Sequence, residues 1–512
     1  MRRILLAAAL LGLAAIAAPA AAQTLRIGLP ASDVGTLDPH RATATQDKGV
    51  VVWVFSGLVR FPPGNADPAA LEPDLAESWQ VSPDGLSYTF RLRAGARFQH
   101  GFGEVTADDV VYSLRRAADR EKSSFATDYA AVASIEAVDP RTVRVTLKEP
   151  VPLALGLFAN YHGGNVVSRR AAEELGDGFR LRPVGSGPFA IDRVEAGQAV
   201  QLVAHEGYFR GKPKLAGITA RYILSDSTRE LAFTSGELEL ISGRREQRWV
   251  ERMRGQRGTV VEVIGPGEFR TLLINTRRAP LDDLRVRQAL AHAIDVGAII
   301  RFVGPDVATR GVSPVPVGYL GMISDLPTFA PDVARARALL AEAGHPNGIT
   351  VKSVVSNISA QLPIMEQVQA QLRRAGITLE MDIVDHATYH TRIRQDLSAL
   401  TFYGAARYPV ADSYLTQFYH SASAPGKPTM SLNFAHCAVA DDLIDAARRE
   451  PDAAKQMAMW AEAQRKIAAA ICSIPLYDLR QVWVRTEKLD LGYTLTGAIH
   501  LAPAVTEATS IR

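Results

Sequence analysis

The chain has 512 residues, of which 47% are hydrophobic and 22% are charged. This is the composition of a globular protein with enough core for two or three domains, and it excludes extended disorder. Lys and Arg number 57 against 54 Asp and Glu, so the net charge indicates neither nucleic acid nor a membrane surface as a partner.

The first 22 residues have the pattern of a secretory signal peptide. Arg2 and Arg3 precede an apolar run over residues 4–18, and small residues follow it. The run is shorter than the roughly 20 apolar residues that cross a bilayer. We predict cleavage after Ala22 and release into a periplasm. No cysteine lies near this position to carry a lipid anchor.

Strand patterns are clearest in the first third of the chain. LSYTFRLR (86–93) and TVRVTLK (142–148) alternate apolar and polar residues, and this alternation predicts half-buried strands. The segment from Phe61 to Pro73 is rich in Pro, Gly and Ala and predicts a loop. We expect this loop to introduce a separate subdomain.

The middle of the chain alternates helices and strands. A strand is predicted to end near Asn275, and a helix follows Pro280 and two aspartates. Helices over 331–344 and 362–376 and a strand over 377–384 come next, which is the order of an α/β lobe. We expect a lobe boundary near residue 274, and SIPLYDLRQVWV (473–484) as a strand that returns the chain to the first lobe.

Two cysteines, Cys437 and Cys472, lie in what the signal peptide makes an oxidising compartment. Helical patterns precede and follow Pro451 between them, one of them carrying Val439 and Leu443. An antiparallel hairpin of these helices would bring its two ends together. We predict a disulfide, which stabilises by roughly 3 to 4 kcal/mol on the chain-entropy model. Two buried free thiols are the alternative.

Eight stretches, in order along the chain, resemble the family 5 solute-binding proteins of ABC importers. This group includes peptide-, nickel- and opine-binding proteins. The stretches are TLDPH (36–40), DGLSYTFRLRAGARF (84–98), VTADDVVYSLRRA (105–117), PVGSGPFAI (183–191), YFRGKPKLAGI (208–218), INTRRAPLDDLRVRQALAHAID (274–295), ARALLAEAGHPNG (336–348) and IPLYD (474–478).

The resemblance implies an α/β periplasmic-binding-protein clamshell of two lobes, type II-like, with an extra subdomain in the first lobe. The first lobe would span 23–273, with the subdomain at about 64–165. The second lobe would span 274–476, and 477–512 would return to the first lobe. Such a protein closes on its ligand by a hinge motion and hands it to a permease that works with ATPase subunits. The family expectation is a monomer without a cofactor or enzyme activity.

One position departs from the pattern of the peptide-binding relatives, in which an Asp followed by Tyr holds the peptide α-ammonium. Counting back from residues 414–415 puts Arg407 in the place of that Asp, with Tyr408 after it and Tyr403 near the family's aromatic residue. A cation there repels an amine by about 4 kcal/mol at 4 Å with an effective dielectric of 20. We therefore predict that Arg407 binds a carboxylate or another anion.

Two alternatives stay open. In the first, Arg407 pairs with Asp412 or Asp396 and only holds its loop. In the second, the protein carries dipeptides or oligopeptides, and Asp412 receives the amine. An organic anion, an opine, a peptide and a chelated metal all remain candidate ligands.

Three further residues are candidates for the binding site. Tyr161 and His162 lie where relatives bring a loop into the cleft, although an ordinary surface loop would look the same. Arg245 follows a segment whose counterpart in the family runs into the cleft, although Arg244, Arg245 and Glu246 also suit a solvated face.

Enzyme and metal signals are weak. His386 and His390 are four residues apart and would share one face of a helix, as metal ligands can. Ala387 stands where a zinc-protease signature has Glu, so a solvated helix face is favoured over a metal site. The sequence lacks a Walker-type lysine loop and a nucleophile elbow, so ATP use belongs to a separate subunit, and a periplasmic hydrolase is the remote alternative.

Overall fold

The computed structural model describes residues 23–512, apart from 152, 359 and 428–431. The predicted signal peptide lies outside these residues. Among the helices that the structure describes, none is both long and apolar enough to span a bilayer.

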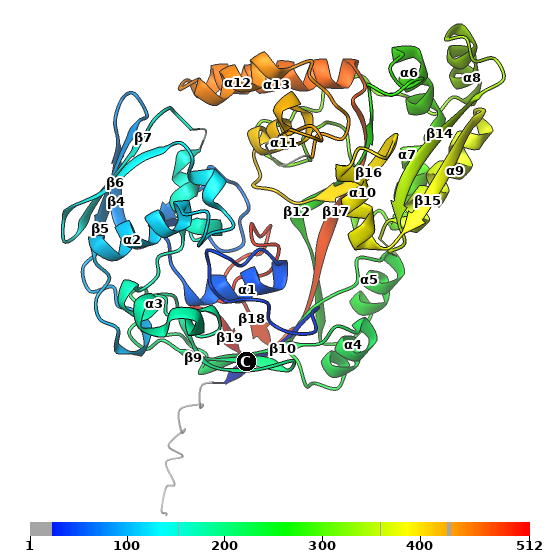
Figure 1. Cartoon of the computed structure of the whole chain (residues 1–512). Coiled ribbons are helices and arrows are strands. Elements are labelled where there is room, and N and C mark those ends of the chain that lie inside the picture. Colours follow the sequence, from blue (N-terminus) through cyan, green and yellow to red (C-terminus); the bar gives the residue numbers. More distant parts are fainter. Residues whose placement is uncertain (1–22, 152, 359, 428–431) are drawn as a thin grey trace, which may run out of the picture.

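One large sheet joins two lobes (Figure 1). Among the described residues, nine strands form it in the order β16, β12, β17, β11, β1, β10, β9 and β8, with β13 paired to β17. These strands are β1 (Thr24–Leu29), β8 (Phe189–Glu195), β9 (Ala199–Ala204), β10 (Gly217–Tyr222), β11 (Leu240–Ser242), β12 (Thr259–Ile274), β13 (Ala308–Arg310), β16 (Leu400–Ala405) and β17 (Ser473–Thr486).

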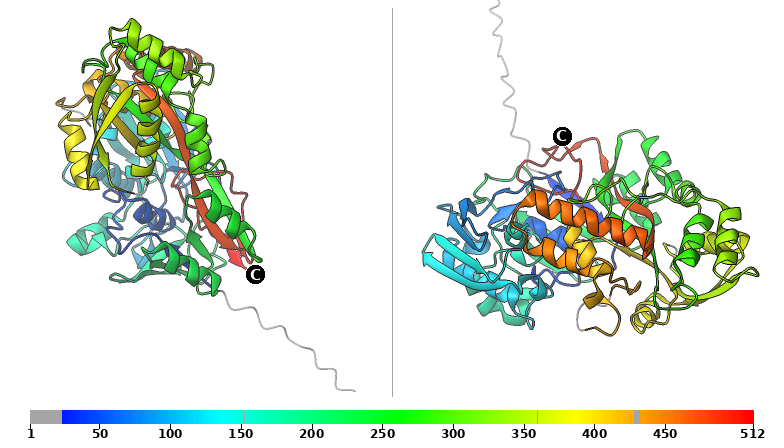
Figure 2. Two further views of the ribbon diagram at one scale, coloured as in Figure 1. Left: turned by 90° about the vertical axis from the view of Figure 1, so that its right-hand side faces the viewer. Right: turned by 90° about the horizontal axis from the view of Figure 1, so that it is seen from above.

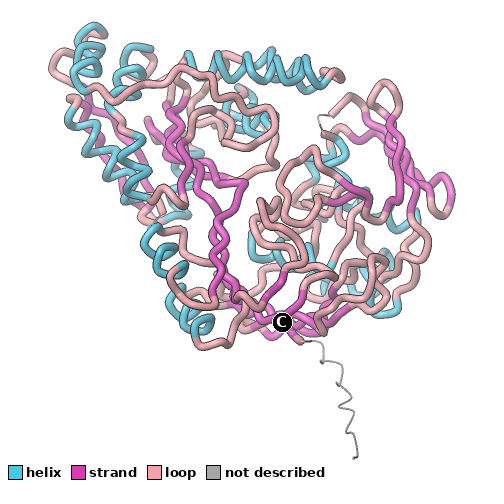
Figure 3. Tube along the Cα trace, turned by 180° about the vertical axis from the view of Figure 1, so that it is seen from behind, coloured by secondary structure: helices cyan, strands magenta, loops and turns pink. Residues whose placement is uncertain are grey.

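Strands β12 and β17 run as an antiparallel pair from one lobe to the other, which Figure 3 shows from behind as two long twisted strands. Their register shifts between Ile264 and Glu268, at the segment Gly265–Gly267. The expected strand over 473–484 is therefore confirmed, and β12 ends at Ile274, next to the predicted end near Asn275.

In the first lobe, β1 lies between β10 and β11 and is parallel to both. The C-terminal segment returns here, because Leu489, Ile499 and Val505 belong to the same hydrophobic core as Leu25 and Ile27. Helices α1 (Thr45–Val54) and α3 (Arg169–Leu175) also belong to this lobe, whereas α4 (Asp226–Thr234) and α5 (Gln247–Arg254) lie beside the lower part of β12 and β17 (Figure 1).

A separate antiparallel sheet extends the first lobe. Its strands are β4 (Ala76–Val81), β5 (Ser87–Leu92), β7 (Thr142–Leu147) and β6 (Val132–Asp139), in that order. Helix α2 (Ala107–Ala118) packs against it and begins with a capping box, in which Thr106 and Asp109 bind each other's backbone amides. Tyr88, Phe90, Val143 and Val145 are buried, as their alternation predicts.

Short pairs and turns complete the first lobe. Strands β2 (Val59–Arg60) and β3 (Glu72–Pro73) pair with each other, as do β18 (Leu489–Asp490) and β19 (Ser510–Ile511). Among the described residues, the 3-10 turns of this lobe are η1 (Gln99–Gly101), η2 (Ala126–Tyr129), η3 (Ala154–Phe158), η4 (His162–Gly164) and η5 (Gly176–Arg180), and η6 (Ser421–Ser423) belongs to the second lobe.

The second lobe contains a parallel strand pair, β14 (Ile349–Ser356) and β15 (Ile377–Val384), joined by α9 (Leu362–Arg374). Gly376 has φ 83°, a conformation that favours glycine, and it ends α9 as predicted. The other helices of this lobe are α6 (Leu284–Ala293), α7 (Val296–Val303), α8 (Val333–Glu342), α10 (His386–Arg394), α11 (Ala411–Tyr419), α12 (Asp441–Arg449) and α13 (Ala453–Ala469).

Helices α12 and α13 form the predicted hairpin, and they lie side by side in the view from above (Figure 2). Cys437 and Cys472 form a disulfide, with their Cα atoms 5.8 Å apart. The predicted apolar face is wrong at Val439, which precedes the helix and is 44% exposed. Ile444 is fully buried instead, because the helix begins only at Asp441.

Candidate functional site

The two lobes contact each other at the loop that follows β16. Tyr408 of this loop packs against Phe61 and Tyr161 of the first lobe, with ring centroids 6.0 and 5.7 Å apart. Gly156 also approaches closely, because a Cβ atom there would lie 2.2 Å from the Tyr408 hydroxyl. At the rim, Arg449 forms an ion pair with Glu149, 3.7 Å from Nε to Oε2.

Arg407 lies next to this contact and has only neutral hydrogen-bond partners. Its Nε donates to Gln417 Oε1 at 2.6 Å and its Nη1 to the Ala406 carbonyl at 3.0 Å. The guanidinium lies over the Phe418 ring, 5.6 Å from the centroid. No carboxylate in the described part of the chain pairs with it, so the guanidinium has no fixed counter-charge.

The two carboxylates considered as partners of Arg407 pair with other residues. Asp412 forms an ion pair with Arg448, 3.4 Å from Nε. Asp396 accepts hydrogen bonds from His436 and from Asn275, both at 2.9 Å. The hypothesis that Arg407 holds its loop through Asp412 or Asp396 is therefore wrong.

Tyr161 and His162 belong to the first-lobe side of the contact. Tyr161 is buried, and its ring stacks on His162 at 3.8 Å between centroids. His162 also stacks on Phe125 at 4.6 Å, and its Nδ1 is 3.7 Å from Asp128 Oδ2. Burial, followed by the charge of Lys48, lowers the pKa of His162 to about 4. These residues form an aromatic wall opposite Tyr408.

Sequence reasoning missed Lys48, which α1 places at this wall. Its ammonium lies 5.7 Å from the ring centroids of both Phe125 and Tyr161. Burial and then the charge of Arg407 lower the pKa of Lys48 to about 8, whereas Asp128 acts to raise it. The available signal was a single Lys in the otherwise apolar second half of the helix, KGVVVWV.

Arg245 has a different environment from Arg407. Its Nη1 donates to Glu268 Oε1 at 2.7 Å, and Arg270 binds the other carboxylate oxygen at 2.5 Å. Burial acts to raise the pKa of Glu268, but Arg245 and Arg270 outweigh it and hold the pKa below its ordinary value. Arg245 is thus neutralised by Glu268 of β12.

Two other predicted positions lie in the second lobe. Tyr403 is 8% exposed and packs against Phe418 and Phe434, so it is part of the core. His386 and His390 are 3.2 Å apart between their Nε2 atoms. Within the described residues, no group of three or more His, Cys, Asp or Glu side chains is arranged to hold a metal ion.

A cavity of about 710 Å³ lies between the lobes, beside the loop of Arg407. Asp67 and Gly497 line it from the first lobe, Tyr319 and Leu320 from the second, and Asp478 from β17. The backbone of Leu320 is hydrogen-bonded to Pro409 and Ala411, one and three residues after Tyr408. Burial raises the pKa of Asp478 to about 7. The volume falls within the range of small-molecule sites. None of the side chains predicted from the sequence lines this cavity.

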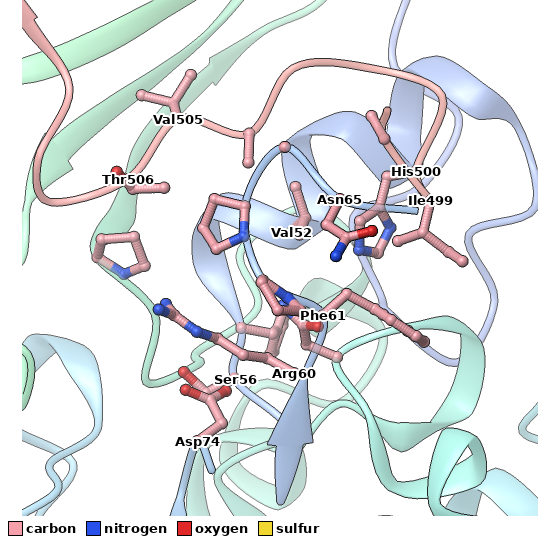
Figure 4. Close-up of a pocket in the computed structure, with 18 of the residues that line it drawn as sticks. Val52, Ser56, Arg60, Phe61, Asn65, Asp74, Ile499, His500, Val505 and Thr506 are labelled. Atoms are coloured by element: carbon pink, nitrogen blue, oxygen red, sulfur yellow. The ribbon is translucent and has the colours of Figure 1, made fainter. Parts of the chain in front are cut away.

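A second cavity, of about 60 Å³, lies within the first lobe (Figure 4). Arg60 and Asp74 point into it in the close-up. Arg60 donates to Glu72 at 2.6 Å, and Asp74 accepts from Arg210 and from the Gly57 amide. Because both charges are already paired and the space suits only a few water molecules, this cavity does not define a solute site.

Two lobes, a pair of crossing strands and a solute-sized cavity between the lobes define a two-lobed binding protein of the periplasmic class. Residues 70–426 match the family described as bacterial extracellular solute-binding proteins, family 5 (middle region). The match covers more than half of the chain, and the chain belongs to this family. The family consists of solute-binding and not of catalytic proteins, and its members serve ABC transporters.

Similar proteins bind different solutes. The chain is 46% identical to MoaA of A. tumefaciens R10, solved in complex with mannopinic acid, with a TM-score of 0.84 and coverage of 96% of this chain and 100% of that one. It is 26% identical to Helicobacter pylori DppA, a periplasmic binding protein associated with an ABC transporter and solved with the peptide STSA (TM-score 0.78, coverage 95% and 98%). It is 29% identical over 472 residues, 90% of each chain, to the glutathione-binding protein GsiB of Escherichia coli O1:K1.

Proposed function

We propose that this protein is the solute-binding component of an ABC importer and that its solute carries a carboxylate or another anion that binds Arg407. The observation that carries the proposal is the state of Arg407. It lies where the two lobes touch and, in the part of the chain that the structure describes, has no carboxylate partner. A planar guanidinium binds a carboxylate by two parallel hydrogen bonds, and these charge-assisted bonds are among the strongest in proteins.

The relatives support an organic acid over a peptide. The protein that is 46% identical over nearly the whole chain was solved with mannopinic acid, which is an acid by its name. The peptide alternative needs a free carboxylate for the amine, and its candidate, Asp412, already pairs with Arg448. A nickel chelate is less favoured, because in the part of the chain that the structure describes the side chains of His386 and His390 hydrogen-bond with each other and with Ser356.

The finer features of the proposal follow from the family. We place the protein in the periplasm, released by cleavage after Ala22 and without a lipid anchor, as a monomer without enzyme activity. It delivers its solute to a permease and ATPase pair at the inner membrane. The relative DppA, described as a periplasmic binding protein associated with an ABC transporter, supports this location and partner.

The proposal includes a hinge between lobes at residues 23–273 and 274–476, with 477–512 in the first lobe. The end of β12 at Ile274 supports the first limit, and the limit at 476/477 falls inside β17, which crosses between the lobes. Ligand-driven closure about paired strands is a known form of domain motion.

The test is a thermal-shift panel on the mature protein after unfolding, removal of bound small molecules and refolding. The compounds are mannopinic acid, glutathione, the peptide STSA, and nickel with histidine. A ligand that binds only the folded state stabilises by about 2.7 kcal/mol at a hundredfold excess over Kd. We expect mannopinic acid to raise Tm and Arg407→Gln to remove the shift. A shift that Arg407→Gln leaves unchanged, whichever compound produces it, would overturn the proposal.

A further inference from the structure

Lys48 is a second cation at the lobe junction without a counter-charge. In the described part of the chain no carboxylate lies within ion-pair distance of its ammonium, which has aromatic rings as its close neighbours. Such cation–π contacts stabilise an ammonium only modestly. The site is also largely withdrawn from water, which disfavours the charged form. The side chain thus keeps a charge that the surrounding protein does not neutralise.

Lys48 and Arg407 come from opposite lobes. Lys48 is on α1 of the first lobe, and Arg407 follows β16 of the second. Their charges act on each other across the junction. Both charges act on His162, and that of Arg407 also acts on Tyr161. Two like charges that approach each other as the lobes close repel, and this repulsion opposes closure.

The other titratable groups around Lys48 do not remove this repulsion. Among the described residues, Asp128 is the anion whose charge acts on Lys48, and its carboxylate lies 3.7 Å from His162 Nδ1. Burial lowers the pKa of His162 to about 4 and that of His500 to about 3, so both are neutral near pH 7. Two cations from opposite lobes therefore act on each other, and the charge of Asp128 offsets that of Lys48 only in part.

We propose that the ammonium of Lys48 and the guanidinium of Arg407 bind the same anionic group of the solute, one from each lobe. This inference rests on the proposed function and adds a mechanism to it. The shared anion converts the repulsion between the lobes into attraction, so the lobes close fully only around an anion. A neutral solute of the same shape leaves the repulsion in place and is rejected even where its other contacts are good.

A binding experiment tests the shared anion. Mannopinic acid is titrated calorimetrically into the wild type, Lys48→Met, Arg407→Gln and the double variant. Each single change is expected to weaken binding about tenfold or more, because it removes one charge-assisted bond. The double variant is expected to lose much less than the product of the two single losses, since both cations act on one group. Lys212→Met, an exposed lysine of the first lobe, is the matched control.

A second experiment needs no ligand. Small-angle scattering measures the radius of gyration of the stripped proteins at low and at high salt. Lys48→Met is expected to be more compact than the wild type at low salt, because one side of the repulsion is gone. Lys48→Arg, which keeps the charge, is expected to match the wild type. High salt is expected to bring the wild type close to Lys48→Met, because salt screens charges.

The outcomes distinguish a failure of the proposed function from a failure of the shared-anion inference. If Arg407→Gln weakens binding and Lys48→Met does not, the proposed function stands and the shared anion is wrong. If neither change weakens binding, both ideas are wrong. Losses that multiply in the double variant mean two separate contacts and overturn the shared group. If mannopinic acid does not bind, the scattering experiment decides. An equal radius of gyration for the wild type and Lys48→Met overturns the repulsion between the lobes on which the proposal depends, and a smaller radius for Lys48→Met supports it.

Discussion

Arg245 and Arg407 occupy similar places but differ in what surrounds them. Each follows a strand of the large sheet, β11 and β16 respectively, and each is half-buried. Arg245 shares the carboxylate of Glu268 with Arg270, whereas Arg407 donates only to an amide side chain and a backbone carbonyl. The number of positive residues near the lobe junction therefore does not show which charge is available to a solute. That depends on whether each positive side chain already has a carboxylate partner.

The largest expected effect is a loss of stability when Arg245, like Arg407, has no carboxylate partner. Glu268→Gln leaves Arg245 and Arg270 without a counter-charge at a mostly buried position. Removing one member of a buried ion pair costs about 3 to 5 kcal/mol of stability. Chemical unfolding at pH 7 measures this loss. Glu246→Gln, an exposed neighbour of Arg245, is the control and is expected to change stability by less than about 0.5 kcal/mol.

The same variant should show a defined pH dependence. The pKa of Glu268 lies below its ordinary value of 4.5. A carboxyl group whose pKa is lowered by folding contributes stability that is present above the ordinary pKa and lost as pH falls through the folded value. The difference between wild type and Glu268→Gln is thus expected to be constant from pH 7 to about 5 and to narrow below pH 4.5. A constant difference down to pH 3 would contradict the pairing.

The second largest expected effect is the loss of stability on removing the disulfide, which lies in the hydrophobic core next to Arg407. Phe418, over which the guanidinium lies, shares a hydrophobic core with the disulfide of Cys437 and Cys472. The disulfide spans 35 positions of the chain. Replacing both cysteines by Ser is expected to lower the free energy of unfolding by about 3 to 4 kcal/mol on the chain-entropy model.

Urea unfolding of the oxidised wild type and the double variant measures that loss. Wild type treated with a reductant is the control, and it should match the double variant. If the double variant were as stable as the oxidised wild type, the disulfide would not support this region.

Local patterns predicted the elements but not the pairing. The alternation and capping of residues 331–384 gave α8, α9 and β15 correctly, because these signals lie within a few residues of each other. The ion pair of Arg245 joins a loop to Glu268, a residue beyond α5, and no pattern near Arg245 in the sequence indicates this partner. The resemblance to the peptide-binding relatives located Arg407, but an alignment of positions does not show which groups its guanidinium contacts.

Lys48 was missed for a related reason. A single Lys in a helix normally lies at the surface, and nothing nearby in the sequence indicates that this one faces another lobe. Only the fold, which brings α1, η4 and the loop after β16 together, shows that Lys48 and Arg407 act on each other. Contacts between segments from opposite ends of a chain are not encoded in local periodicity.

A third prediction compares the two arginines through binding. Arg407→Gln is expected to lower the affinity for mannopinic acid by about 2 to 3 kcal/mol, which is the strength of hydrogen bonds to a charged group. Arg245→Gln is expected to change it less than about threefold, because Glu268 already neutralises that charge. Calorimetric titration measures both. Equal losses of affinity in the two variants would mean that a carboxylate partner in the protein does not determine which arginine binds the solute.

The smallest expected effect tests whether the charge of Lys48 is uncompensated, like that of Arg407, or neutralised, like that of Arg245. Its pKa is about 8 in the folded protein against an ordinary value of 10.5. The unfolded chain thus binds more protons between pH 8 and 10.5, so the stability of the wild type rises with pH in that window. Lys48→Met does not titrate and is expected to be more stable by about 1 to 2 kcal/mol at pH 7.

That advantage of Lys48→Met should shrink steadily from pH 8 and be largely gone by about pH 10. Chemical unfolding of the wild type, Lys48→Met and Lys212→Met across this range measures it. Lys212 is exposed and pairs with Glu206, so its removal is expected to add no such slope. If Lys48→Met and the wild type instead ran parallel from pH 7 to 10, the charge of Lys48 would already be compensated in the folded protein, and Arg407 would be the single unpaired cation of this junction.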